Sequence, residues 1–117
     1  MTRLYLPTTL PALAELDRGG VLGTDTAFVA ADESEESEYD ALVEAAGASA
    51  DLVSGLGHGQ RRRIVVVTDV VGEPATISIA DVVAVHADPA DLPDDADPDD
   101  DLGWYATQEI PDLLGGN

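Results

Sequence analysis

The chain has no cysteine and no lysine, only five positively charged side chains, and few aromatic residues, among them a single tryptophan. The absence of cysteine excludes disulfides, thiolate metal sites and a cysteine nucleophile. No apolar run reaches the roughly 20 residues that a membrane span requires, and residues 1–10 show no signal-peptide pattern. We therefore expect a soluble protein of a reducing compartment, the cytoplasm.

The scarcity of positive charge contrasts with 24 acidic side chains, which give a formal net charge of −19. Such a field repels the phosphates of nucleic acids and anionic membranes, so we expect no direct binding to either. It attracts partners with a basic surface. GC-rich coding or adaptation to salt produces the same composition, so the charge alone does not decide between a functional and a compositional origin.

The apolar pattern predicts one domain, because 117 residues suffice for a single core that buries roughly two thirds of the unfolded surface. The expected strands are 2–7, 26–31, 64–67 and 82–87. The expected helices are a first one capped by Thr8 or Thr9 and ending before Gly19 or Gly20, a second at 37–53 and a third at 102–114. This order, β-α-β-α-β-β-α, predicts an α/β fold, with α+β as the alternative, in two layers with a mixed sheet.

The second predicted helix is the clearest element. Acids and serines precede it and suit the positive end of a helix dipole. Its apolar residues share one face at a spacing of three and four: Tyr39, Leu42, Val43, Ala46, Ala50 and Val53. We expect this face to be buried against the sheet.

The third predicted helix closes the domain. Helical spacing connects Leu102, Tyr105, Ala106, Glu109, Ile110 and Leu113. Asp101 is the expected N-cap, and Pro111 should kink the helix because it lacks an amide donor. Trp104 lies at the edge of this stripe. It either seals the rim of the core or, if exposed, anchors a partner.

A resemblance to a known family lies in two segments, "RLYLPTTL" near the start and "LGWYATQEI" near the end, and in the shorter "VVV" and "VAVHAD" between them. The chain resembles a family of small uncharacterised acidic proteins from actinobacteria, a domain of unknown function. The resemblance implies a cytoplasmic bacterial protein. It implies no activity, cofactor or site residue.

Asp69, His86 and Glu109 are the candidates for acid/base chemistry. An imidazole exchanges protons near neutrality, and a carboxylate can orient it. Glu109 lies within the apolar stripe and would need a partner if buried, for which Arg3 or one arginine of 61–63 is the natural choice. A structural role for His86 is the alternative. The phosphate-loop, serine-hydrolase and zinc-protease motifs are absent, so we expect no cofactor.

Residues 88–101 hold eight aspartates and three prolines, which predicts an exposed loop. Asp95, Asp97 and Asp99 have the alternate spacing of the first calcium ligands in an EF-hand. Asp100, however, stands where the sharp turn needs glycine, and Ala106 stands where the bidentate glutamate belongs, so we expect no metal site. The candidates for contact with a basic partner are Asp94, Asp95, Asp97 and Asp99.

Arg61, Arg62 and Arg63 carry three of the five positive charges. They could bind an anion, the carboxylate of a partner or the protein's own acidic loop, and the last is favoured. The favoured function is noncatalytic: a small acidic accessory or regulatory protein that binds another protein with a basic surface. One alternative is a small enzyme with an acid/base site near Asp69, His86 and Glu109. Another is a homo-oligomeric structural module that uses the face around Trp104.

Overall fold

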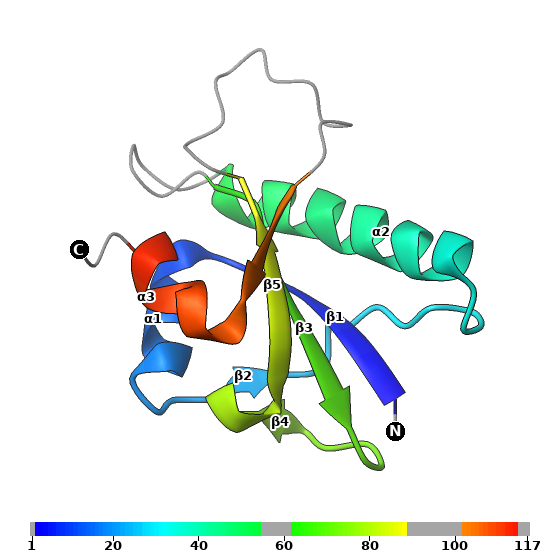
Figure 1. Cartoon of the computed structure of the whole chain (residues 1–117), viewed down its shortest axis with the longest axis horizontal. Helices are drawn as coiled ribbons and strands as arrows, with labels where there is room; N and C mark the ends of the chain where they lie inside the picture. The colour runs from blue at the N-terminus through cyan, green and yellow to red at the C-terminus, as the bar shows by residue number, and fades with distance from the viewer. Residues whose placement is uncertain (1, 55–61, 89–101, 115–117) are drawn as a thin grey trace.

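The computed structural model describes residues 2–54, 62–88 and 102–114, and all that follows concerns these ranges. The main sheet has four strands in the order β1-β3-β5-β6, and each strand is antiparallel to its neighbour (Figure 1). These strands are β1 (Thr2–Thr8), β3 (Ile64–Val70), β5 (Val82–Ala87) and β6 (Gly103–Ala106). A second, two-stranded sheet joins β2 (Leu22–Gly23) to β4 (Thr76–Ile77).

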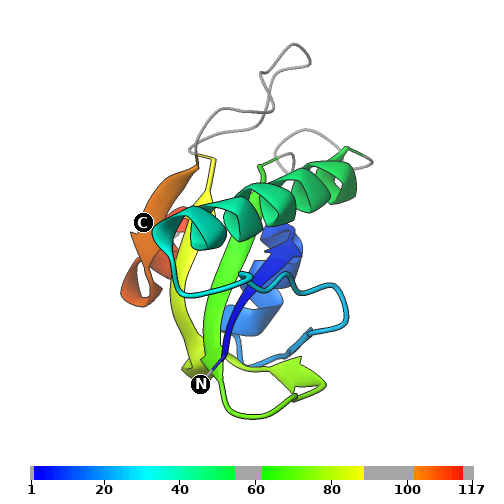
Figure 2. The ribbon, with the colours of Figure 1, turned by 90° about the vertical axis from the view of Figure 1, so that its right-hand side faces the viewer.

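Helices pack on both faces of the main sheet. Helices α1 (Leu10–Asp17) and α3 (Ile110–Leu113) lie on one face, called here the α1/α3 face. Helix α2 (Glu35–Val53) crosses the opposite face, called the α2 face (Figure 2). Because successive strand residues point to opposite sides, β3 sends Ile64 and Val66 to the first face and Val65 and Val67 to the second.

This arrangement confirms the predicted fold class, a single α/β or α+β domain with about four strands and three helices in the main architecture. The sequence predicted a mixed sheet, whereas all three pairings in the main sheet are antiparallel. It also predicted two layers, whereas α2 adds a layer on the second face. The predicted β-α-β start, from strand 2–7 through the first helix to strand 26–31, does not form a parallel pair, because the bridge between Tyr5 and Phe28 is antiparallel.

Helix α1 forms as its sequence predicts. The Thr9 hydroxyl caps it by accepting a hydrogen bond from the Ala12 amide at 3.3 Å, and Pro11 occupies the first turn. Leu13 and Leu16 are fully buried. Gly19 follows the helix with φ of +100°, a left-handed conformation that glycine adopts without strain.

Helix α2 confirms the predicted helix and part of its predicted buried face. Ser34 caps it, and three glutamates occupy its first turn. Tyr39 and Val43 are 52% and 45% exposed, although the sequence predicted both as buried. The buried residues are Ala41, Ala45, Ala46, Ser49 and Val53. The predicted face was therefore wrong at Tyr39 and Val43 and right at Ala46 and Val53, and the small residues of the buried face allow the helix to approach the sheet closely.

The strand predicted at 26–31 is absent. Phe28 alone forms a bridge to Tyr5, with both backbone hydrogen bonds at 2.9 Å. The amide of Ala27 is bonded to the Thr24 carbonyl at 3.1 Å, so the chain turns immediately before the bridge and cannot extend the pairing. The short β2 lies earlier, at Leu22–Gly23.

The helix predicted at 102–114 is wrong in its first half. Residues Gly103–Ala106 form β6, a 3-10 turn follows at Thr107–Glu109, and only α3 is α-helical. Tyr105 and Ile110 both pack into the core of the α1/α3 face, so the spacing of apolar residues resembles that of a helix. Pairing with β5 decides in favour of the strand, because it satisfies the backbone of β6.

Candidate functional site

A buried ion pair joins the start of β3 to the end of β5. Arg63 is 2% exposed and Asp88 is 5% exposed. The guanidinium donates through Nε to Oδ2 at 2.9 Å and through Nη2 to Oδ1 at 2.8 Å. The Arg63 amide also donates to Oδ2 at 2.9 Å, and the Asp88 amide donates to the Arg63 carbonyl at 3.1 Å. This bidentate geometry and its burial define a structural pair.

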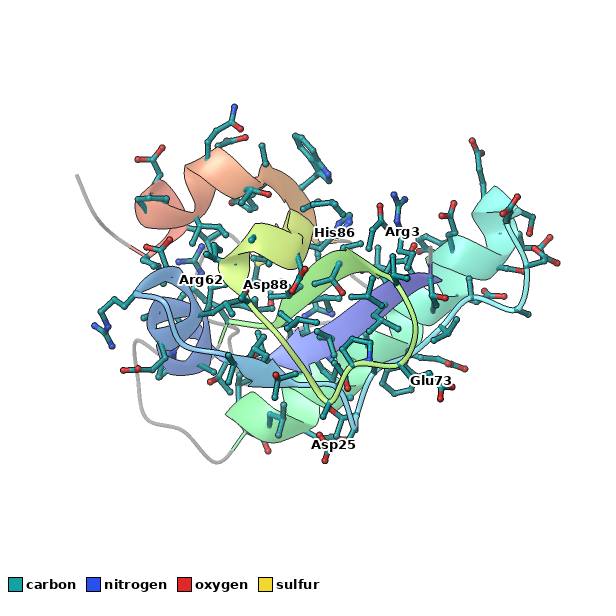
Figure 3. All side chains as sticks on the ribbon, turned by 90° about the horizontal axis from the view of Figure 1, so that it is seen from below. Arg3, Asp25, Arg62, Glu73, His86 and Asp88 are labelled. Atoms are coloured by element: carbon teal, nitrogen blue, oxygen red, sulfur yellow. The ribbon has the colours of Figure 1, made fainter. Side chains whose placement is uncertain are left out.

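Arg62 extends the same connection toward α3. Its Nε donates to the Asp88 carbonyl at 2.8 Å, and its Nη1 donates to the Leu113 carbonyl at 3.0 Å (Figure 3). Both arginines thus bind within the chain, and Asp88 is the first residue of the predicted acidic loop. Arg61 lies outside the described residues. So do the other candidates of that loop, Asp94, Asp95, Asp97 and Asp99.

Asp69 forms an ion pair with Arg3 on the α2 face. The two residues lie opposite each other in β3 and β1, with Nε to Oδ1 at 3.0 Å and Nη2 to Oδ2 at 3.2 Å. The hydrogen bond from Arg3 lowers the pKa of Asp69, so this carboxyl stays ionised near neutrality. Arg3 also reaches Glu38 of α2, with Nη1 to Oε1 at 3.5 Å.

A hollow of about 470 Å³ lies beside this pair. It is bounded by the start of β1, the chain before α2 and the first turns of that helix. Its lining residues are Thr2, Arg3, Val29, Ala30, Asp32, Glu33, Glu38 and Asp69. Carboxylates outnumber the one arginine in this lining, so the hollow is negatively charged.

His86 lies on the α2 face between Val65 of β3 and Trp104 of β6. Burial lowers the pKa of its imidazole, so the ring is neutral at pH 7. Asp69 lies four residues beyond Val65 along β3, a distance of roughly 13 Å at the rise of a strand. Asp69 therefore cannot orient the His86 ring.

Glu109 has a local partner. Its Oε1 accepts a hydrogen bond from the Ala106 amide at 3.1 Å, at the junction of β6 and the 3-10 turn. The predicted partners of Glu109 within the described residues are engaged elsewhere: Arg3 with Asp69, and Arg62 and Arg63 with Asp88. The pairing prediction was therefore wrong for Arg3, Arg62 and Arg63, and Arg61 lies outside the described residues. The three acid/base candidates do not converge on one site.

Trp104 is 61% exposed and lies on β6, which is an edge strand of the main sheet. Its neighbour Tyr105 packs into the core of the α1/α3 face, so the indole projects on the α2 face. Helix α2 packs mainly against β1 and β3, and this leaves the tryptophan open. Of the two sequence-based alternatives for Trp104, the structure shows the exposed one.

Ser49 is a buried residue that the sequence did not single out. Its hydroxyl donates to the Thr8 carbonyl at 2.8 Å and accepts from the Ile64 amide at 2.8 Å. It thereby attaches α2 to the point where β1 ends and β3 begins. The only sequence signal is a serine among the small residues that turn out to face the sheet.

The described ranges contain neither a cluster of metal ligands nor a membrane-spanning helix. Their histidines and carboxylates form no group of three that could hold a metal ion. The helices in those ranges are too short or too polar to cross a membrane.

These features define a class: a small α+β domain with helices on both faces of an antiparallel sheet and a strongly acidic composition. The chain belongs to a family of unknown function (DUF6912), whose model matches residues 2–114. The predicted membership in a family of this kind is confirmed. No curated protein and no solved structure matches the chain.

Proposed function

We propose that this protein is a noncatalytic accessory or regulatory protein that binds another protein with a basic surface. The observation that carries the proposal is Trp104, which is 61% exposed at the open edge of the sheet. Tryptophan is enriched among the interface residues that dominate binding free energy. Burial of this exposed indole against a partner would contribute favourable free energy to binding.

The distribution of charge supports a basic partner. The first half of α2 carries exposed carboxylates, and more of them line the hollow beside Arg3. The exposed acids of this half-helix are Glu35, Glu36, Asp40 and Glu44. Such a surface steers positively charged proteins toward it and makes their association sensitive to salt.

The separation of Asp69 from His86 supports a noncatalytic role. A general base needs a second group within hydrogen-bond reach to hold it in the reactive orientation. Asp69 binds Arg3 and lies roughly 13 Å along β3 from the residue opposite His86, so it is not placed to orient the imidazole. The cytoplasmic location and actinobacterial source that the resemblance implies stay predictions.

The test is affinity purification at low and high salt with the wild-type protein, Trp104→Ala and the control Val71→Ala, which changes an exposed valine in the turn after β3. We expect a basic protein to be retained at low salt by the wild type and by the control. It should be released at high salt and lost in Trp104→Ala. Failure of the wild type to retain any partner at low salt would contradict the proposal.

Self-association through the Trp104 face is the competing result of this experiment. Light scattering of the wild type and of Trp104→Ala distinguishes it. A wild-type dimer that becomes a monomer in the variant would replace the basic partner with a second copy. A wild-type monomer agrees with the proposal.

A further inference from the structure

The edge strand β6 carries the exposed Trp104 and, two residues further on, the Ala106 amide that binds the Glu109 carboxylate. The Ala106 amide donates to Glu109 Oε1 at 3.1 Å, so this amide is turned away from β5 and toward the open edge. Trp104 precedes Ala106 by two residues, so its side chain projects on the same face of the sheet as the Ala106 side chain, next to the edge at which the Ala106 amide binds Glu109. The two positions lie roughly 7 Å apart along the strand. A single long side chain could contact both the indole and the Glu109 carboxylate.

The arginines that the structure describes pair with groups other than the Glu109 carboxylate. Arg3 binds Asp69 and Glu38, and Arg18 binds Glu15. The remaining two, Arg62 and Arg63, bind Asp88. Within the described ranges, each arginine thus pairs with a group other than Glu109, so no arginine of these ranges neutralises the Glu109 carboxylate.

We propose that Trp104 and Glu109 together bind an arginine side chain of the partner. The guanidinium stacks on the exposed indole face, and its N–H groups donate to the Glu109 carboxylate. A carboxylate has about four lone-pair positions, so Glu109 can accept these bonds while it keeps the one from the Ala106 amide. This inference rests on the proposed function, and it names the group through which the partner is recognised.

Arginine fits this site better than lysine does. The guanidinium is planar and weakly hydrated, so it can stack on an indole and still direct N–H donors sideways to a carboxylate. The lysine ammonium is compact and strongly hydrated, and it holds its hydration water more firmly. The overall charge of −19 attracts both types, so the preference for arginine must come from Trp104 and Glu109.

The experiment is isothermal titration of the full chain at low salt with two synthetic peptides of about 12 residues, which carry the same number of cationic residues, arginine in one and lysine in the other. The variants are Trp104→Phe, Trp104→Leu and Glu109→Gln, with Asp17→Asn of α1 as a control that removes an equal charge elsewhere. Trp104→Leu keeps an apolar side chain but has no aromatic ring. Melting temperatures verify that each variant is folded.

We expect the wild type to prefer the arginine peptide by roughly two- to fivefold, the range of one exposed cation–π contact. Trp104→Leu should abolish this preference, and Trp104→Phe should keep part of it. Glu109→Gln should weaken arginine-peptide binding more than Asp17→Asn does. The new amide side chain of Glu109→Gln can still accept the Ala106 N–H through its carbonyl oxygen, so the strand end is preserved in this variant.

The inference would be overturned if Trp104→Leu bound the arginine peptide as tightly as the wild type does. It would also be overturned if Glu109→Gln and Asp17→Asn lost the same amount of affinity for this peptide. These outcomes indicate attraction by net charge alone. The proposed function has its own readout, the partner retained at low salt. A partner that is retained and then lost in Trp104→Ala, together with no peptide preference, would overturn the arginine site and leave the proposed function standing.

Discussion

Arg63 and Asp88 bind each other through side-chain and backbone hydrogen bonds. The pair is buried where the start of β3 lies beside the end of β5. The pair connects residues 25 positions apart, and both charges are removed from water. Arg62 adds the carbonyl of Leu113 to the same connection. Through these contacts the end of α3 is coupled to the central strands.

Asp88→Asn should destabilise the protein by about 3–5 kcal/mol, the usual cost of leaving one partner of a buried ion pair without its counter-charge. The measurement is the free energy of unfolding from urea denaturation. Asp112→Asn, which changes an exposed aspartate on α3, is the control and should stay within about 0.5 kcal/mol of the wild type. Equal stability of the two variants would show that the buried pair does not hold the fold.

Ser49→Ala should reduce stability by about 1–3 kcal/mol, because the Thr8 carbonyl and the Ile64 amide lose a buried partner. Ser54→Ala is the matched control, since the Ser54 hydroxyl donates to the Asp51 carbonyl at an exposed position. Denaturation curves of the two alanine variants compare the sites directly. If both variants lose the same small amount of unfolding free energy, the Ser49 hydroxyl is not needed to attach α2 to the sheet.

Thr68→Val should stabilise the protein by about 1 kcal/mol, because valine has a similar shape and no hydroxyl to desolvate. The Thr68 side chain is fully buried, and its Oγ1 has no hydrogen-bond partner among the described residues. Thr76→Val, at an exposed position of β4, is the control. A lower melting temperature in Thr68→Val would mean that the hydroxyl has a partner after all.

His86 should make stability depend on pH in the slightly acidic range. The unfolded chain takes up a proton at the ordinary pKa of 6.5, whereas burial lowers the pKa of the folded state. More protons are bound to the unfolded state between these two values, so stability is complete above pH 6.5 and falls as the pH decreases through this interval. His86→Gln should flatten the curve of unfolding free energy against pH, and an NMR titration should place the folded pKa below 6.5.

The elements governed by local patterns were predictable from the sequence. Helix α1 has its cap, its proline and its glycine in the expected places, and the apolar run of β3 identifies a strand covered on both faces. Helix α2 begins within two residues of its predicted start. The rotation of α2 about its axis was not predictable. Alanines bury little area, and they face the sheet in place of Tyr39 and Val43 only because the helix lies close to the sheet.

The candidate site was less predictable because its geometry depends on long-range pairing. Segment 103–106 becomes a strand only when β5 lies beside it, and this changes Trp104 from a residue at a helix rim to an exposed residue at a sheet edge. The sequence did suggest that arginines 61–63 could bind the protein's own acidic segment. It could not show that Arg63 and Asp88 would be buried, since burial depends on how β3 and β5 align.

The pairing of β1 with β3 has a consequence for how the chain folds. Partner residues in these strands are 56 to 68 positions apart along the sequence. A nascent chain therefore exposes the apolar Leu4 and Leu6 until residues 64–70 have been synthesised, and it must then close a long loop before these contacts form. We expect folding to be slow for a chain of this size, with the unpaired first strand as the segment that most needs protection from aggregation on the ribosome.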